Sequence, residues 1–223
     1  MISTFIIELT LALYVLLRRE KTNTSVQIGV LILIFLAMFQ LAEYGICEDF
    51  GISSTAWVRF GFASITMLPP LGLHLVYTIA GKRLAPLVIA SYAAALAWIL
   101  TFVATGVMGS AACGGNYVIF RMTEPFDIGF YTYYDALLLL AVFQAIRFSF
   151  RAASKQARVA LWLLVAGYAT FMLPSLIIFA FYGVKGPGNA VPSVMCGFAV
   201  LFALILSLKI LPLADSPGSK VKS

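Results

Sequence analysis

Residues 25–47 read SVQIGVLILIFLAMFQLAEYGIC, a stretch in which the only charged side chain is that of Glu43. A helix of about 20 apolar residues is long enough to cross the roughly 30 Å hydrocarbon core of a bilayer. Stretches of the same character recur along the chain. We therefore predict seven membrane-spanning helices, at Met1–Leu17, Ser25–Cys47, Trp57–Ala80, Ala85–Met108, Phe130–Phe150, Val159–Gly183 and Ser193–Leu211.

The predicted fold class is an all-α polytopic membrane protein. Residues 1–211 form a single seven-helix transmembrane domain in this prediction, and residues 212–223 form a short polar tail. The first apolar segment has its basic cluster after it rather than before it, so we expect it to stay uncleaved as a span.

The composition agrees with a membrane location and excludes several other classes of protein. Hydrophobic residues make up 62% of the 223 residues and charged residues 11%, whereas soluble domains have roughly 45–50% and about 25%. A soluble enzyme, a nucleic-acid-binding domain or a disordered regulator cannot hide so much apolar surface from water. The net charge of +6 is expected of basic cytoplasmic loops and does not indicate a nucleic-acid partner.

Lysine and arginine are divided unequally between the two ends of the predicted helices. Arg59, Arg121 and Lys185 fall on one side, and the other 12 of the 15 basic residues fall on the opposite side. Because basic loops resist translocation, the crowded side is expected to be cytoplasmic. The predicted topology therefore has the N-terminus outside and the C-terminus, with its tail, in the cytoplasm.

Four ionisable side chains fall inside the predicted spans, where each one is costly and is therefore a candidate for function. They are Glu8, Glu43, His74 and Asp135. Counting along each helix places the three carboxyl groups about 6–11 Å below the outer boundary. The three carboxyl groups therefore share the outer half of the predicted bundle.

These carboxyl groups predict an outward-facing polar pocket. Gln40 and Glu43 lie on one face of the second span, bordered by Tyr44. Tyr131 precedes Asp135 by one helical turn, and a tyrosine hydroxyl is a natural partner for a carboxylate held away from water. We interpret six residues as binding a small polar or cationic ligand: Gln40, Glu43, Tyr44, Asp135, Tyr131 and Glu8. The alternative is that the carboxylates lie near the headgroups and reach water.

His74 is the one histidine of the chain, and the predicted span places it beyond the midplane, towards the cytoplasm. It is a candidate for proton relay or pH sensing. The alternative is an imidazole that bonds a neighbouring helix or reaches the cytoplasmic interface. A zinc site needs several histidine or cysteine ligands, so no metal site is predicted. Catalytic and cofactor motifs are also absent from the sequence, and we expect neither a cofactor nor, on balance, an enzyme.

Three prolines interrupt predicted spans and are candidate hinges: Pro69, Pro70 and Pro174. Each proline lacks an N–H group, so the carbonyl four residues earlier, such as that of Thr66 or Thr170, loses its helical partner. Such free carbonyls can shape a cavity or a hinge, but neighbouring side chains commonly satisfy them in structural packing.

The cysteines all lie towards the predicted outer surface, where a disulfide is chemically allowed. We favour a bond between Cys47, at the end of the second span, and Cys113, in the long outer loop Gly109–Gly129, with Cys196 as the odd thiol. Three unpaired cysteines are the alternative. The loop is too rich in aromatic and β-prone residues for disorder, and we expect a short hairpin or a plug over the bundle.

Two stretches carry a family resemblance: FLAMFQLAEYGIC at 35–47 and WVRFGFASITMLPPLGLHLVYTIAGKR at 57–83. They resemble an uncharacterised family of small bacterial seven-helix membrane proteins and, more weakly, the seven-helix sensor region of some bacterial membrane histidine kinases. The matching positions are Gln40, Glu43, Pro69 and Pro70. The resemblance implies a multi-pass protein of the bacterial inner (plasma) membrane and supplies no activity.

The leading functional hypothesis is a receptor-like binding or sensing protein of the membrane. A small-solute or proton-coupled transporter is the alternative, since Glu43 and His74 span both halves and the prolines supply hinges. A third hypothesis is an accessory subunit of a larger membrane complex. The expected partners are the lipid bilayer, a small-molecule ligand, and a protein partner or second copy of the chain, but no nucleic acid.

Overall fold

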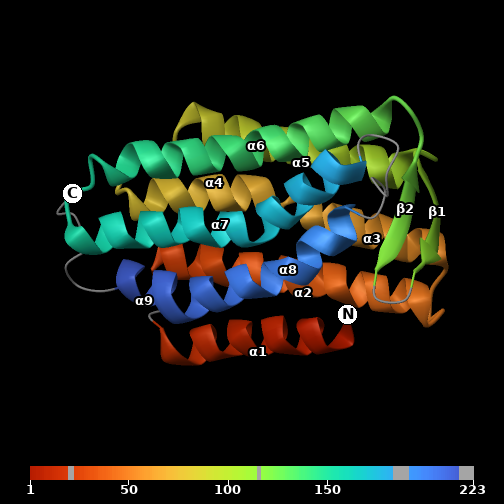
Figure 1. The fold of residues 1–223 in the computed structure, drawn as a ribbon, viewed down its shortest axis with the longest axis horizontal. Helices are drawn as coiled ribbons and strands as arrows, with labels where there is room; N and C mark the ends of the chain where they lie inside the picture. The colour runs from red at the N-terminus through yellow and green to blue at the C-terminus, as the bar shows by residue number, and fades with distance from the viewer. Residues whose placement is uncertain (20–22, 115–116, 183–190, 216–223) are drawn as a thin grey trace.

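A computed structural model of the chain describes residues 1–19, 23–114, 117–182 and 191–215. Its regular elements are drawn in Figure 1. In chain order they are α1 (Ile2–Arg18), α2 (Thr24–Cys47), α3 (Ser54–Thr66), α4 (Leu68–Ile79), α5 (Pro86–Ala104), β1 (Met108–Cys113), β2 (Val118–Met122), α6 (Phe126–Ser149), α7 (Lys155–Tyr182), α8 (Val191–Ile205), the π-helical segment Leu206–Ile210 and α9 (Leu211–Ala214).

The described residues confirm an all-α, multi-pass bundle. Six helical segments are long and apolar enough to cross a membrane, with α3 and α4 counted together and α8 counted through to α9. The seventh expected span is α1, whose 17 residues are at the short end of the range that spans a bilayer. A lipid bilayer is therefore the expected environment, and the side of the bilayer that each end faces stays a prediction.

The helices run side by side, with the β-hairpin across one end of the bundle (Figure 1). We call this the hairpin end; it also holds the start of α1 and the end of α2. The opposite end holds the end of α1 and the turn between α6 and α7. Described basic residues gather there, among them Arg18, Arg151 and Lys155. This gathering of basic residues at one end of the bundle agrees with the unequal division of lysine and arginine found in the sequence.

The third predicted span is one apolar segment, Ser54–Ile79, that is interrupted beside the proline pair. The chain breaks at Met67, and Pro69 and Pro70 occupy the first turn of α4. A missing N–H costs little there, because the first turn of a helix has no intrahelical acceptors for its donors. The carbonyl of Thr66 accepts a hydrogen bond of 2.9 Å from the hydroxyl of Tyr133 on α6. Pro174 lies inside α7, which changes direction part-way along its length (Figure 1).

The long loop forms an antiparallel hairpin, as expected. Cys113 pairs with Val118 in its register, and Ala111 pairs with Phe120. Phe120 is buried and packs against the rings of Phe39 and Phe62, with ring centroids 5.8 Å and 5.1 Å away. The hairpin is therefore part of the core at its end of the bundle.

The last described residues continue as helix beyond the predicted end of the seventh span. α9 carries the chain to Ala214, and the side chain of Asn23, which caps α2, donates a 3.0 Å hydrogen bond to Asp215. This hydrogen bond holds the residues that follow α9 against the start of α2. The rest of the predicted tail, 216–223, lies outside the described residues.

Candidate functional site

A cluster of buried polar side chains lies where α1, α2 and α8 meet. The hydroxyl of Thr4 on α1 lies 2.7 Å from Oε1 of Gln40 on α2 and 2.6 Å from the carbonyl oxygen of Met1. Further along the same helices, Glu8 is 0% exposed, Gln40 2% and Glu43 1%. We call this set, completed by Ser193 of α8, the polar cluster: Thr4, Glu8, Gln40, Glu43 and Ser193.

The two carboxyl groups stand on either side of the Thr4–Gln40 contact. α1 and α2 run in opposite directions (Figure 1). Glu8 is about 6 Å further along α1 than Thr4, away from the hairpin end, and Glu43 is about 4.5 Å nearer that end than Gln40. The carboxyl groups interact electrostatically with each other, and both interact with the amino group of Met1. The cluster is thus a column of polar groups that enters the bundle from the hairpin end.

Several atoms of the column have no hydrogen-bond partner. Within the described part of the chain these include both carboxyl oxygens of Glu8, Oε1 of Glu43 and Nε2 of Gln40. Buried polar groups are satisfied in the great majority of cases, and an isolated buried charge is far costlier than a neutral group. The hydrogen bonds that the described residues supply therefore do not satisfy both carboxyl groups.

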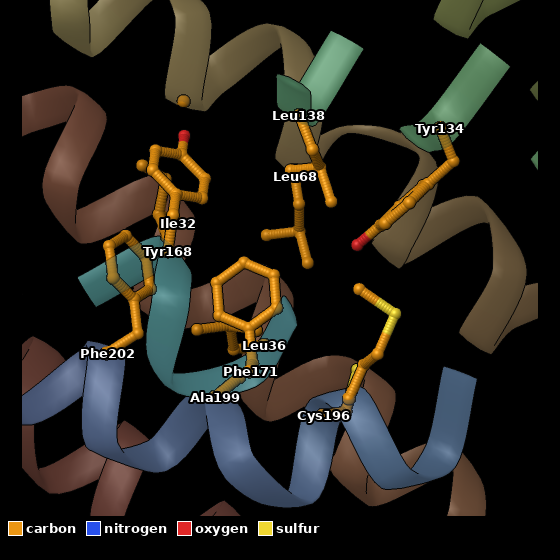
Figure 2. Close-up of a pocket in the computed structure, with 12 residues that line it drawn as sticks. Ile32, Leu36, Leu68, Tyr134, Leu138, Tyr168, Phe171, Cys196, Ala199 and Phe202 are labelled. Atoms are coloured by element: carbon orange, nitrogen blue, oxygen red, sulfur yellow. The ribbon is translucent and has the colours of Figure 1, made fainter. Parts of the chain in front are cut away.

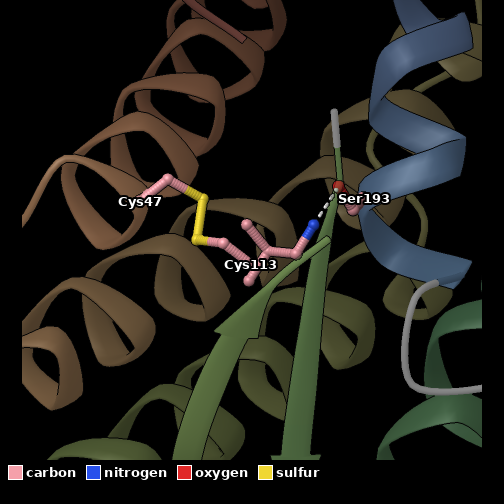
Figure 3. The surroundings of a disulfide bond; sticks show 4 residues. Cys47, Cys113 and Ser193 are labelled. Carbon is pink, nitrogen blue, oxygen red and sulfur yellow. Dashed lines mark hydrogen bonds between the residues drawn. A yellow bond between two sulfur atoms is a disulfide. The ribbon is translucent and has the colours of Figure 1, made fainter. Parts of the chain in front are cut away.

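Ser193 links the cluster to the hairpin. Its hydroxyl forms a hydrogen bond with the carboxyl group of Glu43 and accepts one of 3.0 Å from the backbone N–H of Val118 on β2 (Figure 3). A hydroxyl group has one hydrogen to donate and two lone pairs to accept with, so both contacts can be made at once. Ser193 is buried, with 4% of its surface exposed.

Two small cavities, each of about 30 Å³, lie between the helices: the first is lined by α2, α4, α6, α7 and α8, and the second by α3, α6 and α8. The first is apolar and is bounded by Tyr134, Tyr168, Phe171 and Cys196 among others (Figure 2). Figure 2 shows the hydroxyl of Tyr134 directed into it from α6. A cavity of this size holds one or two water molecules, not an organic ligand.

The second cavity adjoins the first, because Tyr134, Met195 and Cys196 border both. Tyr131 and Asp135 of α6 also line it. The buried thiol of Cys196 interacts electrostatically with Glu8 and Glu43. Cys196 therefore borders both cavities and lies close enough to the polar cluster to interact with its carboxyl groups.

The structure divides the six predicted ligand-binding residues into separate places. Glu8, Gln40 and Glu43 come together in the polar cluster. Asp135 is exposed on α6 and, with Tyr131, borders the second cavity. Tyr44 is half-buried and lies next to Glu43 in the sequence but about 100° further round α2. Neither of the two cavities touches Glu43.

His74 has a structural partner of its own. Its Nδ1 lies 3.1 Å from the hydroxyl of Tyr92 on α5, and the two rings meet edge to face. This is the arrangement that the alternative to proton relay foresaw, an imidazole bonded to a neighbouring helix. Among the described residues no group of three or more histidine, cysteine or acidic side chains is placed to hold a metal ion.

Cys47 and Cys113, the pair that the sequence favours, are joined by a disulfide, and Cys196 is free and buried. Sequence reasoning did not single out Thr4, Ser193 or Tyr134. Thr4 could have been found as the residue one turn before Glu8, on the same helical face. Ser193 carried no such signal, because its role depends on a hydrogen bond to a distant strand.

The chain matches no known protein-family model, no curated protein and no solved structure. The family resemblance noted from the sequence therefore stays a prediction.

Proposed function

We propose that the protein is an integral membrane sensor of small cations, and that its polar cluster takes up a proton from the outer side. The observation that supports this most directly is the burial of Glu8 and Glu43 with three carboxyl oxygens unpartnered. A charged carboxylate inside a membrane costs roughly 2.5–3.5 kcal/mol on insertion scales, and such residues commonly mark ion or proton pathways.

The proton is favoured over a larger ligand because of the space around the carboxyl groups. Both side chains are covered, and neither Glu8 nor Glu43 lines either of the two described cavities. An organic cation would need a pocket that buries most of its surface. A proton needs only the carboxyl oxygen itself, and an alkali ion needs a few oxygen ligands without a larger cavity.

The surroundings of the carboxyl groups supply little positive charge. Within residues 1–19, 23–114, 117–182 and 191–215, the titratable groups that interact with them are the amino group of Met1 on α1, the thiol of Cys196 on α8 and each other. Of these only the amino group is cationic, and it serves two carboxyl groups. Among the described residues, two carboxyl groups thus share one cationic partner.

The test uses the full chain purified in lipid nanodiscs. Proton uptake is measured with a pH-sensitive dye in weak buffer after a jump from pH 8 to pH 6, in the native chain and in Glu8→Gln, Glu43→Gln and the double variant. The native chain should take up about one proton more than the double variant. Glu48→Gln and Asp135→Asn are matched controls, since both residues are exposed. The change in proton uptake that these controls show is subtracted from the change in the variants of Glu8 and Glu43.

Sodium, lithium and potassium chlorides are compared with choline chloride in the same experiment. Proton release on adding one alkali ion, lost in the double variant, would show that this ion competes for the cluster. Uptake by the double variant equal to that of the native chain would overturn the proposal.

A transporter is the second candidate, supported by the break at Met67 and by Pro174 inside α7. Discontinuous helices are common at the binding sites of transporters. In sealed proteoliposomes a transporter would carry protons across the membrane along an imposed potential, and Glu43→Gln would stop the flux. A sensor would take up its proton without any steady flux.

A further inference from the structure

The β-hairpin is set into the bundle beside the polar cluster. Phe120 of β2 packs between Phe39 and Phe62, and Phe39 precedes Gln40 directly. Phe39 lies eight residues before Cys47, which corresponds to about 12 Å along α2. The hairpin therefore reaches as deep as the middle of the polar cluster.

Two connections join the hairpin to Glu43, one by hydrogen bonds and one covalent. Through the first, the N–H of Val118 bonds Ser193, whose hydroxyl bonds Glu43. Through the second, Cys113, which faces Val118 in the strand register, is bonded to Cys47. Cys47 follows Glu43 by one turn of α2. Together with the turn of α2 between Glu43 and Cys47, the two connections close a ring of contacts that includes Glu43. Figure 3 shows the disulfide and the hydrogen bond to Ser193.

The disulfide is the part of this ring that a reagent can reach. Cys113 is an exposed residue and Cys47 is half-buried, whereas Val118 and Ser193 are buried. Solvent access is one of the conditions for thiol–disulfide exchange. An attacking thiol would therefore meet the sulfur of Cys113 first.

We infer that the hairpin is a plug over the polar cluster, held in place by the Cys47–Cys113 bond and released by a dithiol reductant. The inference rests on the proposed function, because it assigns a regulation to the same site. The partner it requires is a dithiol, free or carried by a protein, on the side of the membrane that the hairpin end faces.

The exchange is balanced. A thiolate of the dithiol attacks Cys113 and forms a mixed disulfide, while the electron pair of the broken bond leaves on Cys47, which takes up a proton. The second thiolate of the reductant then displaces Cys113, which also ends as a thiol. Two electrons pass to the two cysteines, and the dithiol becomes a disulfide.

Cys196 provides a reporter, because it is the remaining thiol when the disulfide is formed. The rate at which a small maleimide labels Cys196 is measured by mass spectrometry of its peptide. The oxidised chain, the chain after dithiol treatment and the Cys47→Ser/Cys113→Ser variant are compared in nanodiscs. Both forms without the disulfide should be labelled at least about tenfold faster, since local opening exposes the thiol. Glu48→Gln, which keeps the disulfide and alters an exposed residue, should remain close to the oxidised chain.

A second reporter separates release of the plug from unfolding. Ala160 is fully buried on α7, towards the opposite end of the bundle, and Ala160→Cys should stay slow to label when the disulfide is reduced. Equal acceleration at both positions, or no acceleration at Cys196, would overturn the inference. The labelling rate of Cys196 does not depend on proton uptake, so the two proposals can fail separately. Faster labelling without proton uptake would support the plug and overturn the proposed function. Proton uptake with an unchanged labelling rate would support the proposed function and overturn the plug.

Discussion

The hydroxyl of Tyr133 donates a 2.9 Å hydrogen bond to the carbonyl of Thr66. Thr66 precedes Pro70 by four residues, so its carbonyl is the one that an N–H at position 70 would have bonded in a continuous helix. A side chain of α6 thus satisfies a backbone group that the sequence of α3 and α4 leaves free. The break at Met67 is accordingly a fixed part of the packing as well as a candidate hinge.

Tyr133→Phe should lower the free energy of unfolding by about 1 kcal/mol, the usual contribution of one hydrogen bond. Pro70→Ala supplies an N–H to the same carbonyl, so the effect of Tyr133→Phe should shrink in that background. Unfolding in mixed micelles, followed by circular dichroism, measures the four proteins of the cycle. An unchanged effect of Tyr133→Phe in the Pro70→Ala background would show that the two groups do not share the carbonyl.

Gly72→Ala should destabilise the contact between α4 and α7. A Cβ atom at Gly72 would overlap the hydroxyl oxygen of Tyr168, and overpacking of this kind costs typically about 1–3 kcal/mol. Tyr168→Phe removes that oxygen, so the double variant should recover most of the loss in melting temperature. Gly197→Ala is the matched control, because its Cβ would meet nothing within 4 Å. A double variant no more stable than Gly72→Ala would show that overlap with the hydroxyl of Tyr168 is not what destabilises Gly72→Ala.

The spans and the cysteine pairing could be predicted because they depend on quantities that are local in the sequence. Length and hydropathy decide whether a helix can cross the bilayer. Once the spans are assigned, Cys47 and Cys113 fall at the same predicted surface. The hairpin followed from the β-prone residues of the loop Gly109–Gly129. These features do not require knowledge of which helices are neighbours.

The composition of the site could not be predicted to the same extent. Lipid tails are as apolar as a protein core, so hydrophobic periodicity does not separate the inner from the outer face of a membrane helix. α6 shows this directly: Tyr134 is buried whereas Asp135, the adjacent residue, is exposed. Hydropathy offers no means of choosing between these two faces, and the predicted pocket consequently combined residues of the polar cluster with residues that border the second cavity.

His74→Gln should leave proton uptake by the polar cluster unchanged. The imidazole bonds Tyr92 on α5, while the cluster is built from α1, α2 and α8. The free energy of unfolding should instead fall by about 0.5–1.5 kcal/mol, the usual contribution of one hydrogen bond. Tyr92→Phe should lower it by a similar amount. Uptake with the dye and unfolding in micelles are measured on the same samples. A loss of uptake in His74→Gln comparable to that in Glu43→Gln would indicate a relay through both halves and would favour transport.

The stability of the native chain should fall as pH rises through the range in which the polar cluster releases its proton. The folded state would hold a proton that the unfolded chain, with its carboxyl groups in water, has already lost, so unfolding releases that proton. The free energy of unfolding then decreases by about 1.4 kcal/mol per pH unit for each proton held. Glu8→Gln/Glu43→Gln should show no such slope, and Glu48→Gln, altered at an exposed carboxyl group, should keep it. Parallel pH profiles for the native chain and the double variant would mean that the two buried carboxyl groups exchange no proton on unfolding.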